Sequence, residues 1–134
     1  MNRFAGHVVL FGLGIVGAEV LVHLVEAGLD VIAVDRAPTE RARSIAASSN
    51  TQIIIGNVTS PEVFEALHIT AARAFISCTS DDKVNLETAL RVTDAAPSLR
   101  TVVRLNNDTL PDNLRRGFRH GPSSAFRPWR RPPS

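Results

Sequence analysis

The feature that most constrains the fold is the motif Gly12-Leu13-Gly14-Ile15-Val16-Gly17, in which the glycines are spaced as GxGxxG. It follows the apolar run Val8–Phe11, which is typical of a strand buried on both faces. It opens segment 15–27, whose few polar residues lie in one narrow stripe of a helix. A glycine-rich turn between a buried strand and a buried helix predicts a βαβ unit with parallel strands.

The rest of the chain continues this alternation of strands and helices. Further strands are expected at 31–34, 52–55, 74–78 and 101–105, and helices at 38–48, from Ser60-Pro61, from Asp81 or Asp82 to Pro97, and at 108–116. Right-handed crossovers then predict an α/β fold: a Rossmann-like, doubly wound parallel sheet of five strands in the order 3-2-1-4-5. A sixth strand is not expected, because the pattern dissolves after Gly117.

Length and charge predict one folded domain, residues 1–117, and an Arg/Pro-rich tail, residues 118–134. The 134 residues are too few for a nucleotide-binding domain plus a substrate domain. Residues 1–114 carry a net charge of −4, whereas residues 115–134 carry six arginines and no acid. The prolines of residues 118–134 predict that this tail is disordered. Binding of anionic lipid, binding of nucleic acid and a shifted reading frame are the alternatives for it.

The N-terminus, the lengths of the apolar runs and the cysteine count predict a cytoplasmic protein. The N-terminus does not resemble a signal peptide, and no apolar run approaches the roughly 20 residues of a membrane-spanning helix. The single cysteine, Cys78, can form no internal disulfide and is expected to be a buried, inert thiol.

The glycine motif in this context predicts a site for nucleotide phosphates. Gly12 makes the tight turn, Gly14 lets the backbone approach a pyrophosphate, and Gly17 lets the helix pack close to the strand. The amides of the first helical turn, at Ile15 and Val16, then face the phosphates at the positive end of the helix dipole.

Asp35 and Arg36 bear on the choice of nucleotide. Asp35 ends the second strand about 20 residues after the motif, where a carboxylate accepts hydrogen bonds from a ribose. Its charge favours NAD(H), ATP, ADP or AMP over NADP(H). Arg36 leaves this preference open, because an arginine here can accept a 2′-phosphate, stack on adenine or remain solvated.

Further segments add a family resemblance. The chain reads Gly56-Asn57-Val58-Thr59, then Leu67-His68-Ile69 and Ala72-Arg73-Ala74, then Thr79-Ser80-Asp81-Asp82 with Asn85. Together with the glycine motif and Asp35, this order resembles the regulator-of-potassium-conductance domain, also called the TrkA N-terminal domain. The resemblance covers about residues 6–117.

The resemblance implies further ligand contacts. Asn57 and Val58 would lie beside the adenine, although the family usually has an aspartate at the position of Asn57. Thr79 and Ser80 would line the ribose and phosphates, and Arg104 would reach a phosphate. Asp81 and Asp82 are expected to cap the following helix rather than contact ligand, and Asn85 to tie the turn.

The resemblance also implies a function. The chain would be a cytoplasmic regulatory subunit that binds NAD(H), ATP or ADP and acts on a membrane potassium transporter or channel. It would do so as a homo-oligomer or when completed by another chain, either as a minimal regulator or as a degenerate remnant. No catalytic residue or metal site is expected, because the chain has no tyrosine, one lysine and no two histidines at metal-ligand spacing.

Two other functions stay open at this stage. One is a truncated NAD-dependent oxidoreductase domain, and the other is a nucleic-acid module that acts through the basic tail. Nucleic acid is not the expected partner, since a net positive charge is found only in the last twenty residues.

Overall fold

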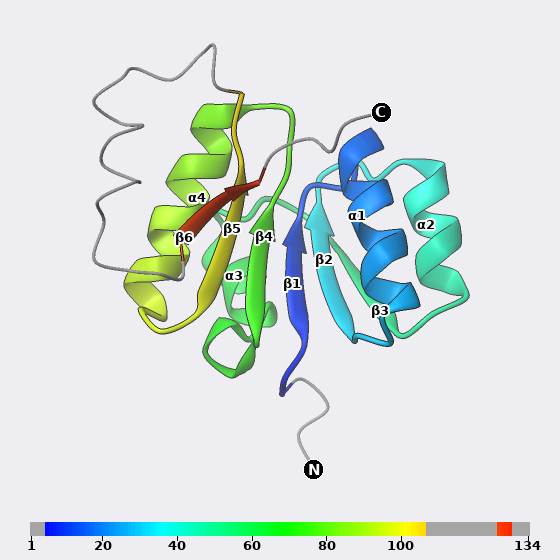
Figure 1. Cartoon of the computed structure of the whole chain (residues 1–134), viewed down its shortest axis with the longest axis horizontal. Coiled ribbons are helices and arrows are strands. Elements are labelled where there is room, and N and C mark those ends of the chain that lie inside the picture. Colours follow the sequence, from blue (N-terminus) through cyan, green and yellow to red (C-terminus); the bar gives the residue numbers. More distant parts are fainter. Residues whose placement is uncertain (1–4, 107–125, 130–134) are drawn as a thin grey trace.

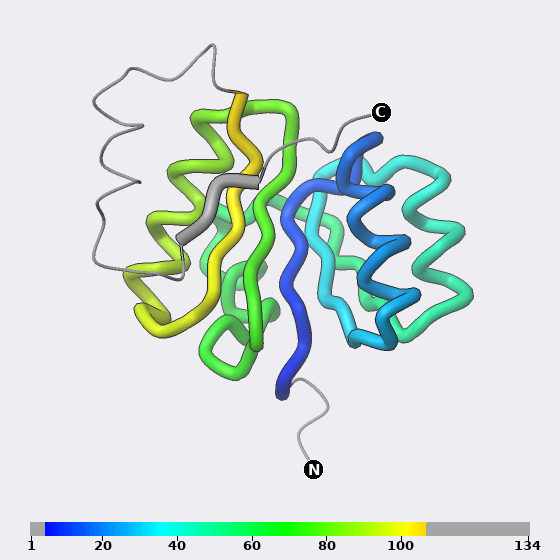
Figure 2. Tube along the Cα trace, viewed as in Figure 1, coloured from blue at the N-terminus to red at the C-terminus, as the bar shows by residue number. Residues whose placement is uncertain are grey.

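The strands form one parallel sheet. The computed structural model describes residues 5–106 and 126–129, and the strand order is β3-β2-β1-β4-β5-β6. β1 pairs with both β2 and β4, so segments far apart in the sequence lie side by side at the centre (Figures 1 and 2). The strands are β1 (Val8–Phe11), β2 (Val31–Asp35), β3 (Thr51–Ile55), β4 (Ala74–Ser77), β5 (Arg100–Arg104) and β6 (Phe126–Trp129). The predicted order of the first five strands is confirmed.

Helices cover both faces of this sheet. They are α1 (Ile15–Glu26), α2 (Glu40–Ala47), α3 (Pro61–Ala66), the short 3-10 helix η1 (Ile69–Ala71) and α4 (Asp82–Ala95). Leu10 and Ala33 of the sheet pack with α1 and α2 in one apolar cluster. Val9 and Ile32 pack on the other face in a second cluster that α3, η1 and α4 join. Successive residues of a strand point to opposite faces of the sheet. Because helices cover both faces, every residue of β1 is buried.

The helix starts differ in how their amides are satisfied. Thr39 caps α2 by accepting from Ala42 N, and Asp81 caps α4 by accepting from Val84 N, as expected for Asp81. Ser60 precedes α3 without capping it, because its hydroxyl donates to Glu62 instead, at 2.7 Å. α1 follows Gly14, which has no side chain to offer, so its first-turn amides need another acceptor.

The expectation of no sixth strand is wrong. β6 pairs in parallel with β5, from Thr101 opposite Phe126 to Arg104 opposite Trp129. Pro128 argued against a strand in the sequence, but an edge strand forms its ladder on one side only and therefore tolerates proline. β6 falls within the segment expected to be a tail, and the domain boundary at residue 117 stays a prediction. The expected helix at 108–116 lies outside the described residues.

The other predicted boundaries lie within two residues of the observed ones. In the described ranges, 5–106 and 126–129, the structure has no helix with the length and apolar character needed to cross a bilayer.

Candidate functional site

Three glycines shape the loop between β1 and α1. Gly12 has a positive φ of 103°, and a Cβ added there would lie 2.8 Å from the backbone nitrogen of Thr79. A Cβ at Gly17 would lie 1.9 Å from the carbonyl oxygen of Gly12. Gly14, in contrast, has no heavy atom within 4 Å of its Cβ position. Gly12 and Gly17 therefore permit close packing, and Gly14 borders open space at the start of α1.

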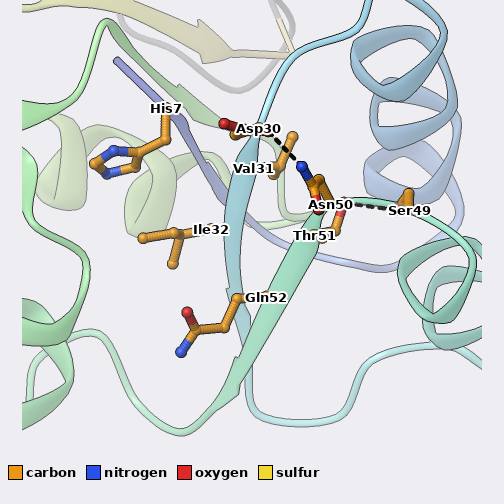
Figure 3. A pocket seen from close by; sticks show the side chains of 8 residues that line it. All are labelled: His7, Asp30, Val31, Ile32, Ser49, Asn50, Thr51 and Gln52. Carbon is orange, nitrogen blue, oxygen red and sulfur yellow. Dashed lines mark hydrogen bonds between the residues drawn. The ribbon is translucent and has the colours of Figure 1, made fainter. Parts of the chain in front are cut away.

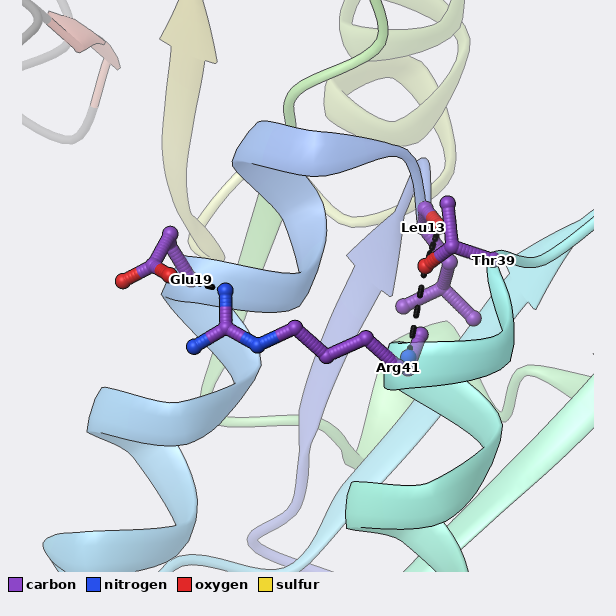
Figure 4. A network of polar contacts seen from close by, with 5 residues as sticks. Leu13, Glu19, Thr39 and Arg41 are labelled. Carbon is purple, nitrogen blue, oxygen red and sulfur yellow. Dashed lines mark hydrogen bonds and ion pairs between the residues drawn. The ribbon is translucent and has the colours of Figure 1, made fainter.

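The connection between β2 and α2 holds this glycine loop in place. Leu13 N donates to Asp35 Oδ2 at 2.5 Å, while Leu13 O accepts from Thr39 N at 3.0 Å and from Thr39 Oγ1 at 3.1 Å. Figure 4 shows Thr39 beside Leu13 and, further out, an ion pair of Arg41 with Glu19 that joins α2 to α1. The loop is thus fixed before any ligand arrives.

Asp35 contributes more to the loop than the sequence predicts. Its second carboxylate oxygen, Oδ1, accepts from Ala37 N at 2.9 Å. A carboxylate oxygen has more than one acceptor position, so these two backbone contacts leave capacity for ribose hydroxyls. Asp35 thus joins the end of β2 to the glycine loop through backbone amides.

A cavity of about 460 Å³ opens at the carboxyl ends of β2, β3 and β4. Open α/β sheets bind ligands at this edge. Five predicted site residues line it: Asp35, Arg36, Asn57, Val58 and Thr79. The lining also includes Phe11, Gly56, Thr59 and Asp81. Helix α4 forms one wall of the cavity with Val84, Glu87, Thr88 and Arg91. Gly12, Gly14, Ile15, Val16, Gly17, Ser80 and Arg104 are not among its lining residues.

The contribution of α4 to the cavity lining was not predicted from the sequence. Arg91 Nη1 donates to Val58 O at 2.6 Å, and its guanidinium lies 4.1 Å from the centre of the Phe64 ring. Val84, Thr88 and Arg91 follow helical spacing, which could have placed them on one face. Only the tertiary structure shows that this face meets the loop after β3.

Asn85 ties the turn after β4, as predicted, and it also bonds the end of β5, which was not predicted. Its buried Oδ1 accepts from Thr79 N at 2.9 Å, from Thr79 Oγ1 at 2.6 Å and from Ser77 Oγ at 3.1 Å. Its Nδ2 donates to the carbonyl oxygens of Thr79 and Arg104. Arg104 Nη1 also donates to Thr79 O, at 3.1 Å. Arg104 thus supports Thr79, while its contact with a phosphate stays a prediction.

The side chains of Cys78 and His7, which carry reactive groups, are both buried. Cys78 is buried, its thiol faces Gly12 O at 3.6 Å, and burial raises the pKa of this thiol to about 12. The thiol is therefore neutral and inert near pH 7, as expected. His7 is buried, and its Nε2 lies 2.9 Å from Leu67 O.

A second cavity, of about 290 Å³, lies at the other end of the strands, beside the first residues of β2 and β3 (Figure 3). Its polar side chains bond to one another: Asn50 Nδ2 donates to Asp30 Oδ1 at 3.1 Å, and Ser49 Oγ to Thr51 Oγ1 at 3.0 Å. Figure 3 shows His7 and Gln52 on the side away from Ser49, so the lining groups do not converge. The first cavity is therefore the better candidate site.

Comparison with known families agrees with this geometry. The sequence profile of the TrkA-N domain matches residues 8–121. The chain belongs to the TrkA-N domain family. This confirms the resemblance seen in the sequence motifs. No curated protein matches the sequence.

Solved structures share the fold of this TrkA-N domain. The TrkA-N domain of the inner membrane protein YbaL from Escherichia coli is 17% identical with a TM-score of 0.69, over 80% of this chain and 78% of that one. The Kef CTD of Shewanella denitrificans, in its AMP-bound form, is 19% identical with a TM-score of 0.68, over 90% and 69%. The GsuK channel bound to NAD is 19% identical with a TM-score of 0.60, over 76% of this chain and 18% of that one. At these identities the likeness shows the fold.

Proposed function

We propose that this TrkA-N domain binds NAD(H) or another adenine nucleotide, such as ATP or ADP, and regulates a membrane potassium transporter or channel from the cytoplasm. The observation that carries the binding proposal is the open space at Gly14. Gly14 stands at the uncapped start of α1, and the residue before it, Leu13, bonds the Asp35 carboxylate through its backbone N–H. A phosphate and a ribose are the groups that complement these two features.

The ligand would lie across the edge of the sheet. Its phosphates would meet the amides of Ile15 and Val16, its ribose would bond Asp35, and its base would enter the cavity beside Val58. Thr79, Ser80 and Arg104 would complete the phosphate side. The negative charge of Asp35 opposes a 2′-phosphate, so NADP(H) would bind more weakly.

The regulatory role rests on family membership and on the ligands of similar folds. The Kef domain is in an AMP-bound form, and the GsuK channel is bound to NAD. Nucleotide binding controls a partner only when the ligand has different affinities for two arrangements of the assembly. That assembly would be a homo-oligomer or a complex in which another chain completes the site.

The first test is a thermal-shift panel of NAD, NADH, NADPH, ATP, ADP and AMP with the full chain and with Gly14→Val. A ligand at 100 times its Kd stabilises by about 2.7 kcal/mol. We expect stabilisation of the wild-type protein and none of the variant, whose own melting temperature should stay close to wild type because its side chain enters open space. Equal shifts for both proteins would reject the binding site.

The second test separates a regulator from an oxidoreductase, since dehydrogenases also use this type of sheet. Potassium uptake is compared in cells with and without the gene, and purified protein is assayed for sustained NADH oxidation with small carbonyl substrates. We expect uptake to change and no turnover to occur. Unaltered uptake together with turnover that Gly14→Val removes would reject the regulator in favour of an oxidoreductase domain.

A further inference from the structure

The hydrogen bonds of Asn85 determine which protons Thr79 can share with a ligand. Asn85 is fully buried, and its Nδ2 donates to the carbonyl oxygens of Thr79 and Arg104, at 2.9 and 3.0 Å. A carbonyl oxygen can only accept, so the side-chain atom of Asn85 that faces these two groups is the nitrogen. The side-chain atom that faces Thr79 N is therefore the oxygen, Oδ1, which has no proton to donate.

Both donors of Thr79 are directed at that oxygen. Thr79 N donates to Asn85 Oδ1 at 2.9 Å, and Thr79 Oγ1 lies 2.6 Å from the same atom. Because Oδ1 only accepts, the hydroxyl proton of Thr79 lies between the two oxygens. Thr79 Oγ1 also accepts from Asp81 N at 3.2 Å, which leaves one of its two lone pairs. Thr79 thus offers an acceptor to a ligand and would lose its bond to Asn85 if it donated.

Asp81 gives this part of the cavity the same polarity. Thr79 and Asp81 both line the cavity, whereas Ser80 between them is not among its lining residues. The backbone N–H of Asp81 is bonded to Thr79, and its carboxylate Oδ1 accepts from Val84 N. A carboxylate has further acceptor positions and no proton. Acceptors and a negative charge complement a hydroxyl group and oppose a phosphate.

The strand order determines which part of a nucleotide reaches Thr79, and this step rests on the proposed function. β1 lies between β2 and β4. Neighbouring strands are about 4.8 Å apart, so the ends of β2 and β4 are separated by roughly 10 Å. If a ribose bonds Asp35 and the phosphates meet the loop after β1, the end of β4 is left for the group that follows the phosphates. That group is a second ribose in a dinucleotide and a third phosphate in ATP, and ADP ends before it.

We propose that Thr79 is a specificity-determining residue that accepts a hydrogen bond from a hydroxyl of this second ribose, with its polarity set by Asn85. The site then selects a dinucleotide such as NAD over ADP and ATP. The second ribose brings the donors that Thr79 and Asp81 complement, whereas a third phosphate brings acceptors and charge.

The test is calorimetric titration of the full-length protein with ADP and with ADP-ribose, which adds the second ribose without a second base. Wild type should bind ADP-ribose more tightly than ADP. Thr79→Val keeps the shape of the side chain and removes the acceptor. It should therefore lower the ratio of ADP-ribose affinity to ADP affinity by about three- to tenfold, the effect of one hydrogen bond. The difference in charge between the ligands cancels in this comparison, because the variant carries the same charge as wild type.

Thr79→Ser retains the hydroxyl and should recover most of the ratio that valine loses. Thr70→Val is the matched control, because it removes an exposed threonine hydroxyl on η1, outside the cavity, and it should leave the ratio unchanged.

Three results would overturn the inference while the proposed function stands. Wild type binds ADP at least as tightly as ADP-ribose, Thr79→Val leaves the ratio unchanged, or Thr79→Ser lowers it as much as Thr79→Val does. Binding of neither ligand overturns both. If Thr79→Val does not fold, the wild-type comparison of the two ligands decides the inference.

Discussion

At the scale of single residues, the three glycines of the motif serve two purposes. Gly12 and Gly17 allow backbone atoms to approach each other more closely than any side chain permits, with a Cβ at Gly17 only 1.9 Å from Gly12 O. Gly14 keeps a space open, and its φ of −79° suits any residue. The structure therefore separates two glycines that close packing requires, Gly12 and Gly17, from one that packing does not require, Gly14.

This separation predicts opposite outcomes for two matched variants. Gly17→Ala should destabilise the protein by about 1–3 kcal/mol or more, because the methyl group forces α1 away from the β1 end. Gly14→Ala should change stability by less than about 1 kcal/mol, the usual range for a helix N-cap. Urea unfolding of the two variants measures both values, and similar midpoints for both would contradict the packing argument.

At the scale of elements, the β2–α2 connection supports the site. Thr39 caps α2 and also bonds the carbonyl of Leu13, so one side chain joins a helix start to the glycine loop. The neighbouring Arg41–Glu19 pair is half exposed. Exposed pairs of this kind contribute about 0–1 kcal/mol, so the Thr39 hydroxyl is the stronger link.

Thr39→Val tests this link with little change of shape. Loss of the hydroxyl removes the cap and should lower the free energy of unfolding by about 1–2 kcal/mol. Hydrogen exchange should show reduced protection at the Ala42 amide, which loses its acceptor. Thr39→Ser keeps the hydroxyl and is the control. If valine and serine behave alike at Ala42, the hydroxyl is not the link.

At the scale of the whole molecule, β6 extends the sheet beyond the five strands predicted from the sequence. It adds backbone pairing along β5, which otherwise forms the edge. An uncovered edge leaves a row of unpaired backbone groups. The segment that contains β6 is therefore expected to contribute to stability.

Deletion of residues 118–134 removes β6 and should lower the melting temperature by several degrees, since about 1 kcal/mol shifts a domain of this size by roughly 4 °C. Deletion of residues 130–134 alone retains β6 and should have little effect. Thermal unfolding of both truncated proteins decides the matter. The interpretation of residues 118–134 as a disordered tail predicts no loss in either case, and that result would contradict a stabilising role for β6.

The order of five strands and the position of the glycine loop could be predicted from the sequence. Apolar periodicity identifies the elements, and the handedness of crossovers then restricts how parallel strands can be arranged. The helix cap at Asp81 and the bond from Asn85 to Thr79 were predictable for a related reason, because each contact joins residues a few positions apart.

Contacts between residues far apart in the sequence could not be predicted and are known only from the fold. The clamp of Asp35 on Leu13 N joins positions 22 residues apart, and Arg91 reaches Val58 across 33 residues. Neither contact leaves a pattern in the local sequence, because it depends on where two backbones come to lie. β6 escaped prediction for the same reason: a proline-containing segment pairs at a sheet edge when the neighbouring strand provides the ladder, and its own composition does not report that neighbour.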